Sequence, residues 1–138
     1  MNRVLQMRLV VETADYERAV AFYRDVLGAR EELVVHGENG EQVTILDVGR
    51  ATLELSNPAQ VAMIDQVEVG RRVAPPLRVA FEVADVRQAT TDLVASGAEL
   101  IAAPTRTPWN SLNARLAAPA DLQLTLFQEL EPGADRQS

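Results

Sequence analysis

The side chains in this sequence that are able to do chemistry are mainly arginine and glutamate. The chain of 138 residues has no cysteine, all 13 of its basic residues are arginine, and His36 is its single histidine. Thiolate chemistry, disulfides and lysine-based mechanisms are therefore excluded. Arginine stays charged at every working pH and donates paired hydrogen bonds to carboxylates, phosphates and phenolates.

Two of the arginines, Arg8 and Arg78, occupy equivalent places in a repeated octet. Residues 8–15 and 78–85 carry Arg, Glu, Ala and Asp in register. Each octet leads into a segment with helical periodicity, so the repeat predicts two copies of one structural unit. The glutamate four residues after each arginine lies on the same face of an extended strand as the arginine.

The segments after the octets predict a helix and three strands in each copy. Helices are predicted over residues 16–27 and 86–96, each with an aspartate at the N-cap and a glycine just after its end. An Asn-Gly pair at residues 39–40 predicts a hairpin with a type I′ turn. The predicted strands are 31–36, 42–48, 51–55, 99–103, 112–117 and 122–128.

These elements predict an α+β fold with two βαβββ modules in tandem, over about residues 4–56 and 77–129. Each module would be a curved four-stranded mixed sheet with one helix, and the two together would form a cleft in a single domain. Residues 57–76 carry few regular signals and are predicted to be a linker. Residues 130–138 are predicted to be a frayed tail.

Charge and hydropathy argue against two classes of partner. The net charge is −7 and there is no basic run, so nucleic-acid binding is not expected. No apolar segment approaches the roughly 18 residues of a membrane span, and the N-terminus has no signal-peptide core. A cytoplasmic location is expected.

The helix of the first copy resembles a signature of the vicinal-oxygen-chelate superfamily, which includes glyoxalase I, extradiol dioxygenases, fosfomycin-resistance enzymes and bleomycin-resistance proteins. Residues 15–28 read DYERAVAFYRDVLG, with the aspartate, Phe-Tyr and Leu-Gly of that signature. Residues 79–85, VAFEVAD, resemble the first strand of the second module. Residues 118–121, APAD, resemble the turn before the last strand, with only the proline matching. The resemblance covers about residues 4–129.

The resemblance implies where a metal ion would bind. Its metal-dependent members take ligands from the first and last strands of each module, and the corresponding residues are Arg8, Glu54, Arg78 and Thr125. Only Glu54 is an accepted ligand type, because arginine has no lone pair to offer and threonine is a weak ligand. The sequence therefore predicts that the metal site is lost and that no cofactor is bound.

The resemblance also implies that both arginines point into the cleft, where two interpretations remain open. In the first, Arg8, Arg78 and Glu54 form an internal ion cluster that replaces the metal ion as a structural tie. In the second, the arginines and Thr125 receive an anionic group of a small ligand. Trp109, the only tryptophan, is either a rim residue that covers the end of the sheet or an aromatic wall that stacks on a planar ligand.

Three functions are compatible with these residues. The leading one is a metal-free binder of a small organic molecule, sequestering an antibiotic or a metabolite. The acidic surface favours a cationic ligand, whereas the arginines favour an anionic or aromatic one. The second is a metal-independent lyase or isomerase with Glu54 as the catalytic base. The third is a non-catalytic scaffold or regulator, and a homodimer is expected in each case.

Overall fold

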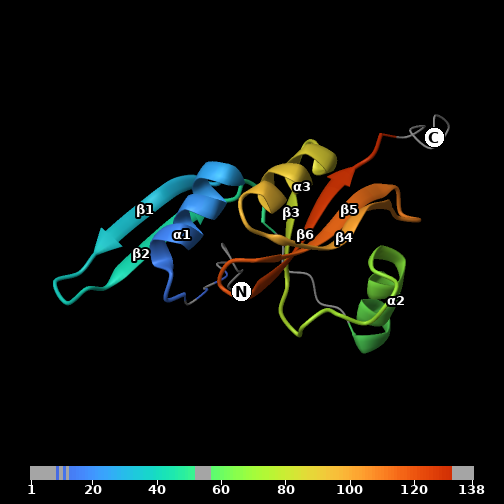
Figure 1. Ribbon diagram of the computed structural model, residues 1–138, viewed down its shortest axis with the longest axis horizontal. Coiled ribbons are helices and arrows are strands. Elements are labelled where there is room, and N and C mark those ends of the chain that lie inside the picture. Colours follow the sequence, from blue (N-terminus) through green and yellow to red (C-terminus); the bar gives the residue numbers. More distant parts are fainter. Residues whose placement is uncertain (1–8, 10, 12, 52–56, 132–138) are drawn as a thin grey trace, which may run out of the picture. The chain divides into compact units, whose positions relative to one another are not determined.

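The computed structural model describes residue 9, residue 11, residues 13–51 and residues 57–131 (Figure 1). Its chain divides into two compact units, Met1–Leu55 and Ser56–Ser138. Each unit is an arrangement of helix and antiparallel or mixed sheet, as expected for an α+β fold. No helix in the described part of the chain is long and apolar enough to cross a membrane.

The first unit contains a helix and a β-hairpin. The helix starts as α1 (Tyr16–Val20) and continues as a π-helical turn, η1 (Ala21–Val26). The Leu27 N–H donates to the carbonyl of Phe22, five residues back, at 3.0 Å. The helix predicted over 16–27 is thus present and is followed by Gly28 with φ +86°. Asp15 differs from the prediction, because its side chain makes no capping hydrogen bond.

The hairpin pairs β1 (Arg30–His36) with β2 (Gln42–Asp47) in antiparallel register. Its turn is wider than the predicted type I′ turn. Gly40 has φ +87°, but Asn39 is not among the described residues with positive φ. The Asn39 N–H instead donates to the Glu41 carboxylate at 2.9 Å, and the Gly37 N–H donates to the Glu41 carbonyl at 2.8 Å. The strand predicted over 51–55 lies almost entirely outside the described residues.

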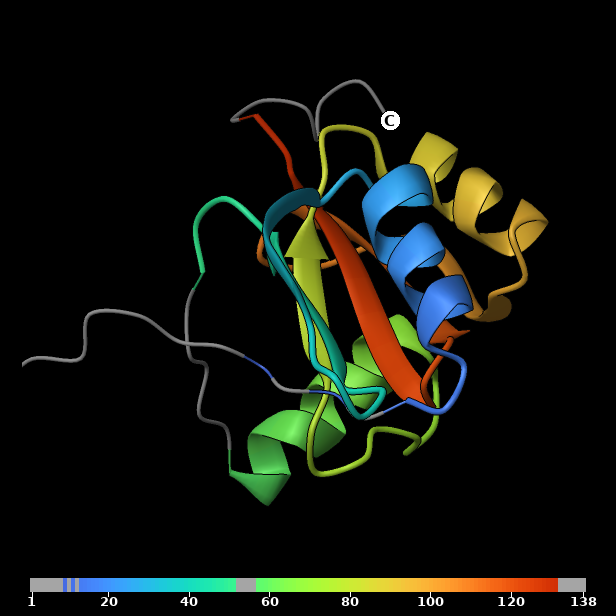
Figure 2. The ribbon, with the colours of Figure 1, turned by 90° about the vertical axis from the view of Figure 1, so that its left-hand side faces the viewer.

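The second unit contains a four-stranded sheet and two helices (Figure 2). The strand order is β3-β6-β5-β4, with β3 parallel to β6 and the other pairs antiparallel. This gives the mixed sheet that the sequence predicted for the second copy. In chain order the elements are α2 (Pro58–Glu68), β3 (Val79–Glu82), α3 (Val86–Ala95), β4 (Glu99–Arg106), β5 (Ser111–Ala118) and β6 (Leu122–Glu129).

Helix α2 was not predicted, because residues 57–76 were expected to form a linker. Asn57 caps this helix by accepting a hydrogen bond from the Gln60 N–H at 2.9 Å, and Pro58 occupies its first turn. Gly70, with φ +87°, follows its end, and its N–H donates to the carbonyl of Asp65 at 2.9 Å. The segment is therefore a regular helix with ordinary start and stop signals.

The sheet of the second unit has one apolar and one polar face. The apolar face carries side chains from β5 and β6 that are fully buried and contact α3, which contributes Val86 and Leu93. These strand residues are Ala114, Leu116, Leu124 and Leu126. Asp85 caps α3 by accepting from the Gln88 N–H at 3.1 Å, as predicted, and Gly97 follows it with φ +107°. Alternation along the strands places the buried Asn113, Arg115 and Thr125 on the opposite face, to which α2 is bonded.

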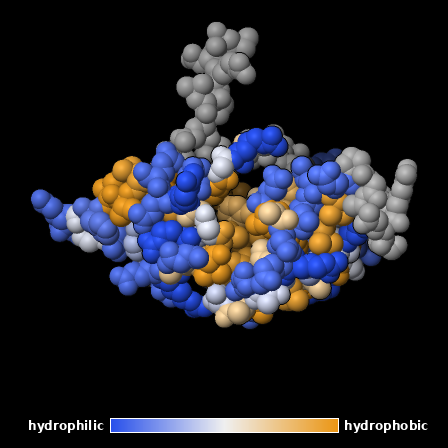
Figure 3. Space-filling model, turned by 90° about the horizontal axis from the view of Figure 1, so that it is seen from above, coloured by the Kyte–Doolittle hydropathy of each residue, from blue (hydrophilic) through white to orange (hydrophobic). Residues whose placement is uncertain are grey.

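Exposed apolar side chains also occur, and a group of them lies on the hairpin of the first unit. Leu33, Val35 and Val43 share one face of the hairpin and are between 46% and 50% exposed. Figure 3 shows that, on the face it presents, apolar patches lie between hydrophilic residues.

Candidate functional site

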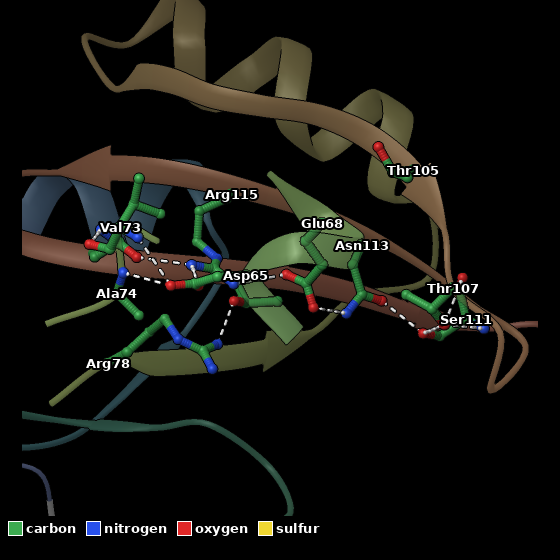
Figure 4. A network of polar contacts seen from close by, with 12 residues as sticks. Asp65, Glu68, Val73, Ala74, Arg78, Thr105, Thr107, Ser111, Asn113 and Arg115 are labelled. Atoms are coloured by element: carbon green, nitrogen blue, oxygen red, sulfur yellow. Dashed lines mark hydrogen bonds and ion pairs between the residues drawn. The ribbon is translucent and has the colours of Figure 1, made fainter. Parts of the chain in front are cut away.

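Arg115 is the centre of a buried polar network on the second unit (Figure 4). The side chain is fully buried on β5. Its Nη1 donates to Asp65 Oδ1 at 2.8 Å and to Gln123 Oε1 at 3.0 Å, and its Nη2 donates to Glu68 Oε1 at 3.0 Å. Both carboxylates come from α2, one helical turn apart. Two negative charges therefore compensate the buried guanidinium, as a buried ion requires.

Asp65 connects this centre to the segment that follows α2. Its Oδ2 accepts hydrogen bonds from the Val73 N–H at 2.9 Å, the Ala74 N–H at 3.0 Å and Arg72 Nη1 at 2.9 Å. Burial of the carboxylate favours its protonated form. The hydrogen bonds from Ala74, Arg115, Val73 and Arg72 outweigh that effect and hold the pKa of Asp65 well below its usual range.

The network continues from Glu68 towards the turn between β4 and β5. Asn113 Nδ2 donates to Glu68 Oε2 at 2.9 Å, and the Ser111 hydroxyl donates to Asn113 Oδ1 at 2.7 Å. The hydroxyls of Thr107 and Ser111 are 2.7 Å apart, and the Thr107 N–H donates to the Ser111 carbonyl at 2.8 Å. The side chains of Thr107, Ser111 and Asn113 thus form a chain of hydrogen bonds that ends at the Glu68 carboxylate. In such a chain each hydrogen bond polarises the next.

Two of the predicted site residues, Arg78 and Thr125, lie side by side. Arg78 precedes β3, and its Nη1 donates a hydrogen bond to the Thr125 hydroxyl on β6. Ala80, two residues after Arg78, is the register partner of Thr125. Arg78 and Thr125 therefore lie on the same, polar face of the sheet. Thr125 is also paired in register with Arg115 on its other side and is buried, while Arg78 is half-buried.

Trp109 is not brought to this pair. It lies 46% exposed in the turn between β4 and β5, at the end of the sheet where Ser111 pairs with Glu129. Arg78 precedes β3 at the end where β3 pairs with Leu124. Along β6 these ends are five residues apart, which corresponds to about 17 Å at the usual rise of a strand. The two residues therefore lie at opposite ends of the sheet of this unit.

Arg8 and Glu54, the other two predicted site residues, lie outside the described residues, as does Glu12. Within residues 9, 11, 13–51 and 57–131, no group of three or more His, Asp or Glu side chains is placed to hold a metal ion. Two of the four positions implied by the resemblance lie among the described residues. They hold the Arg78 cation and the Thr125 hydroxyl, which are hydrogen-bonded to each other. Neither the charge nor the lone pairs of this pair suit a metal ion.

His36 lies on the hairpin, as predicted, in an open depression of the first unit. The depression has a volume of about 520 Å³ and lies between the first helix and the hairpin. The Tyr16 and Thr44 hydroxyls form a hydrogen bond within it, and Gln42 Nε2 lies 3.4 Å from His36 Nδ1. Most of its lining is exposed, so it does not provide the buried polar groups that a selective site needs.

The buried trio Asp65, Glu68 and Arg115 was missed in the sequence. Asp65 and Glu68 are three residues apart in a segment whose apolar residues show no single face, and Arg115 sits in a strand among apolar neighbours. One signal was present, since Asn57-Pro58 is a common helix start and Gly70 a common helix stop. A helix over this segment places both carboxylates on one face.

Comparison with known proteins confirms the family. The model of the Glyoxalase/Bleomycin resistance protein/Dioxygenase superfamily matches residues 5–122, so the chain belongs to this superfamily. No curated protein matches the sequence.

Solved structures of the same superfamily are similar in fold. A glyoxalase/bleomycin resistance protein/dioxygenase from Nocardioides is 24% identical, with 96% of this chain and 88% of that chain covered and a TM-score of 0.52. A superfamily member from Sphaerobacter thermophilus is 21% identical, with 90% and 100% covered and a TM-score of 0.55. A glyoxalase family protein from Bacillus cereus is 14% identical, with 94% and 97% covered and a TM-score of 0.58. At these identities the similarity shows the fold alone.

Proposed function

We propose that this protein binds a small organic anion, a carboxylate or a phenolate, at Arg78 and Thr125 without using a metal ion. The observation that carries the proposal is the hydrogen bond from Arg78 to Thr125 on the polar face of the sheet. These two residues stand at strand positions where metal-dependent relatives are expected to have ligands. A cation there favours direct recognition of the negative group that a metal ion would otherwise contact.

Arg78 itself favours an anion over a cation, because its guanidinium is positively charged and the Thr125 hydroxyl that accepts its hydrogen bond is neutral. Arg115, the neighbouring buried cation, is compensated by the carboxylates of Asp65 and Glu68. A carboxylate that approaches Arg78 would meet a half-buried guanidinium, beside which a charged hydrogen bond is stronger than in open water.

We propose binding as the function, because the guanidinium of Arg78 and the hydroxyl of Thr125 are both able to donate hydrogen bonds to an anion. We therefore propose a sequestering role towards a metabolite or an antibiotic with an acidic group, in a cytoplasmic homodimer. Trp109 is not included in this site, because the sheet register separates it from Arg78.

The proposal is tested with Arg78→Met and a matched control, Arg87→Met. Arg87 is exposed on α3, so its replacement changes the net charge equally without touching the polar face. Benzoate, acetate and inorganic phosphate would be titrated into each protein and followed by thermal shift and by arginine Nε–H resonances in NMR. Benzoate is expected to stabilise the wild type and Arg87→Met, since a ligand stabilises the state that it binds.

Arg78→Met is expected to lose this stabilisation while remaining folded. If benzoate stabilises Arg78→Met as much as the wild type, Arg78 is not the anion site. Metal analysis provides a second check, because one tightly bound divalent ion per chain in the purified protein would contradict a metal-independent site.

A further inference from the structure

The two acidic residues of α2 reach different parts of the second unit through the same arginine. Asp65 and Glu68 lie one turn apart, a spacing that puts both on one face of a helix. Each contributes one oxygen to Arg115, and each uses its other oxygen for a different partner. Figure 4 shows these partners at opposite ends of the network.

At one end, Asp65 fixes the backbone that leads to Arg78. Asp65 Oδ2 accepts from the Val73 and Ala74 N–H groups, and Gln123 Nε2 donates to the Val73 carbonyl at 3.3 Å. The Val73 N–H and carbonyl are therefore both hydrogen-bonded, the first to a side chain of α2 and the second to a side chain of β6. Arg78 follows four residues after Ala74, immediately before β3. The direction in which the chain enters β3 depends on these bonds.

At the other end, Glu68 fixes the turn that carries Trp109. Its Oε2 accepts from Asn113, which accepts from Ser111, and Ser111 is bonded to Thr107. Thr107 and Ser111 flank the turn on its two sides. The Trp109 turn and the approach to Arg78 are thus held by neighbouring residues of one helix, through separate branches of one network.

We propose that Asp65 is a positioning residue for the anion site: beyond the ion pairs that both carboxylates make with Arg115, Asp65 orients the approach to Arg78, whereas Glu68 holds the Trp109 turn. The inference rests on the proposed function of Arg78 but assigns a role to a residue that does not contact the ligand. It makes α2, which lies outside both predicted modules, part of the binding site of the second unit.

Asp65→Asn and Glu68→Gln form a matched pair for the test. Each replaces one of the two carboxylates on Arg115 by an amide of the same shape, and so each weakens one of the two buried ion pairs of that arginine. Only Asp65→Asn places an N–H₂ group or a weaker acceptor against the Val73 and Ala74 N–H groups. A purely structural role would give both variants the same effect on binding.

Hydrogen exchange gives the first readout and needs no ligand. Asp65→Asn is expected to speed exchange of the amides at residues 73 and 74 while leaving those of Asn110 and Ser111 near their wild-type rates. Glu68→Gln is expected to do the reverse. Equal acceleration of both segments in both variants, or of neither, overturns the assignment of separate roles.

Benzoate affinity, measured by NMR titration on the folded protein, gives the second readout. Asp65→Asn is expected to bind about tenfold more weakly than the wild type, a size typical of indirect coupling between residues, and Glu68→Gln within about threefold. If Arg78→Met loses benzoate binding but Asp65→Asn does not, the positioning role is wrong and the anion site stands. If Arg78→Met binds normally, the proposed function itself is wrong.

A milder variant keeps the test usable if Asp65→Asn does not fold. Gln123→Met removes the hydrogen bond to the Val73 carbonyl and the one that Gln123 accepts from Arg115, and leaves the ion pairs of Arg115 with Asp65 and Glu68 in place. It is expected to weaken benzoate binding and to speed exchange at residue 74 in the same direction as Asp65→Asn. Unchanged affinity together with faster exchange would contradict the positioning role.

Discussion

Arg115 on β5 and Asp65 on α2 form an ion pair of 2.8 Å although 50 residues separate them in the sequence, and neither side chain is more than 1% exposed. With Glu68, also almost fully buried, they hold a helix against the sheet through charged groups. A buried pair of this kind adds little stability compared with apolar packing. Removal of one partner nevertheless costs much, because the other charge is left buried without compensation.

Arg115→Met is therefore expected to destabilise the protein by about 3–5 kcal/mol, because it leaves Glu68 without its buried cation and Asp65 with only the exposed Arg72. Urea unfolding at neutral pH measures this change. Arg24→Met is the control, since Arg24 is paired with Asp25 and Glu31 at the surface, where water screens the pairs. The control is expected to keep the midpoint of the wild type. A similar loss of unfolding free energy in both variants would show that burial does not increase the contribution of the Arg115 ion pairs to stability.

Acidification is expected to weaken the attachment of α2. The folded-state pKa of Asp65 lies below that of the unfolded chain, which is about 3.9 for an aspartate. Its contribution to stability is therefore complete above about pH 5 and is lost as the pH falls through the folded-state pKa. Asp65→Asn should be less stable than the wild type at neutral pH but should lose less stability between about pH 5 and pH 2. Urea unfolding at a series of pH values checks this, and parallel pH curves would contradict it.

The two predicted helix caps are expected to differ in strength. Asp85 accepts the Gln88 N–H and caps α3, whereas the Asp15 side chain makes no capping hydrogen bond. Asp85→Ala should cost about 1 kcal/mol, and Asp15→Ala should cost clearly less. Thermal or urea unfolding of the two variants makes the comparison. An equal loss of unfolding free energy in the two variants would mean that Asp15 stabilises its helix without a capping hydrogen bond.

Tyr23 is expected to titrate at higher pH than an ordinary tyrosine. Burial disfavours the phenolate and raises the pKa of Tyr23 to about 12. The stability that comes from burying the neutral phenol is complete below the unfolded-state pKa of about 10 and is lost as the pH rises towards 12. Ultraviolet titration of the wild type and Tyr23→Phe, which has the same shape without the titrating group, measures the difference. A late tyrosinate transition that survives in Tyr23→Phe would contradict the assignment.

The second sheet was largely predictable because its strands alternate and its helix carries standard end signals. Asp85 and Gly97 mark the ends of α3 in the sequence as they do in the structure. The adjacency of Arg78 and Thr125 was also accessible, since the family resemblance placed them on the first and last strands of one module. The hairpin was found but its turn was not, because the Glu41 side chain binds the turn backbone and replaces the geometry that Asn-Gly usually adopts.

The polar network was not predictable by the same reasoning. Pattern analysis assumes that the inner face of a helix is apolar, and on α2 that face carries Asp65 and Glu68. Arg115 shows no sign in the sequence that it is buried, because its partners lie on another element. Trp109 was expected either to cover the end of the sheet as a rim residue or to stack on a ligand, and the strand register places it at the other end of the sheet from Arg78.

The complete burial of Arg115 also has an evolutionary consequence. Changing Arg115 alone leaves two enclosed carboxylates without their shared cation, so loss of the arginine before the carboxylates passes through an unstable intermediate. Related sequences that lack the arginine should therefore also lack both carboxylates. An alignment of close homologues in which the three positions vary independently would contradict this expectation.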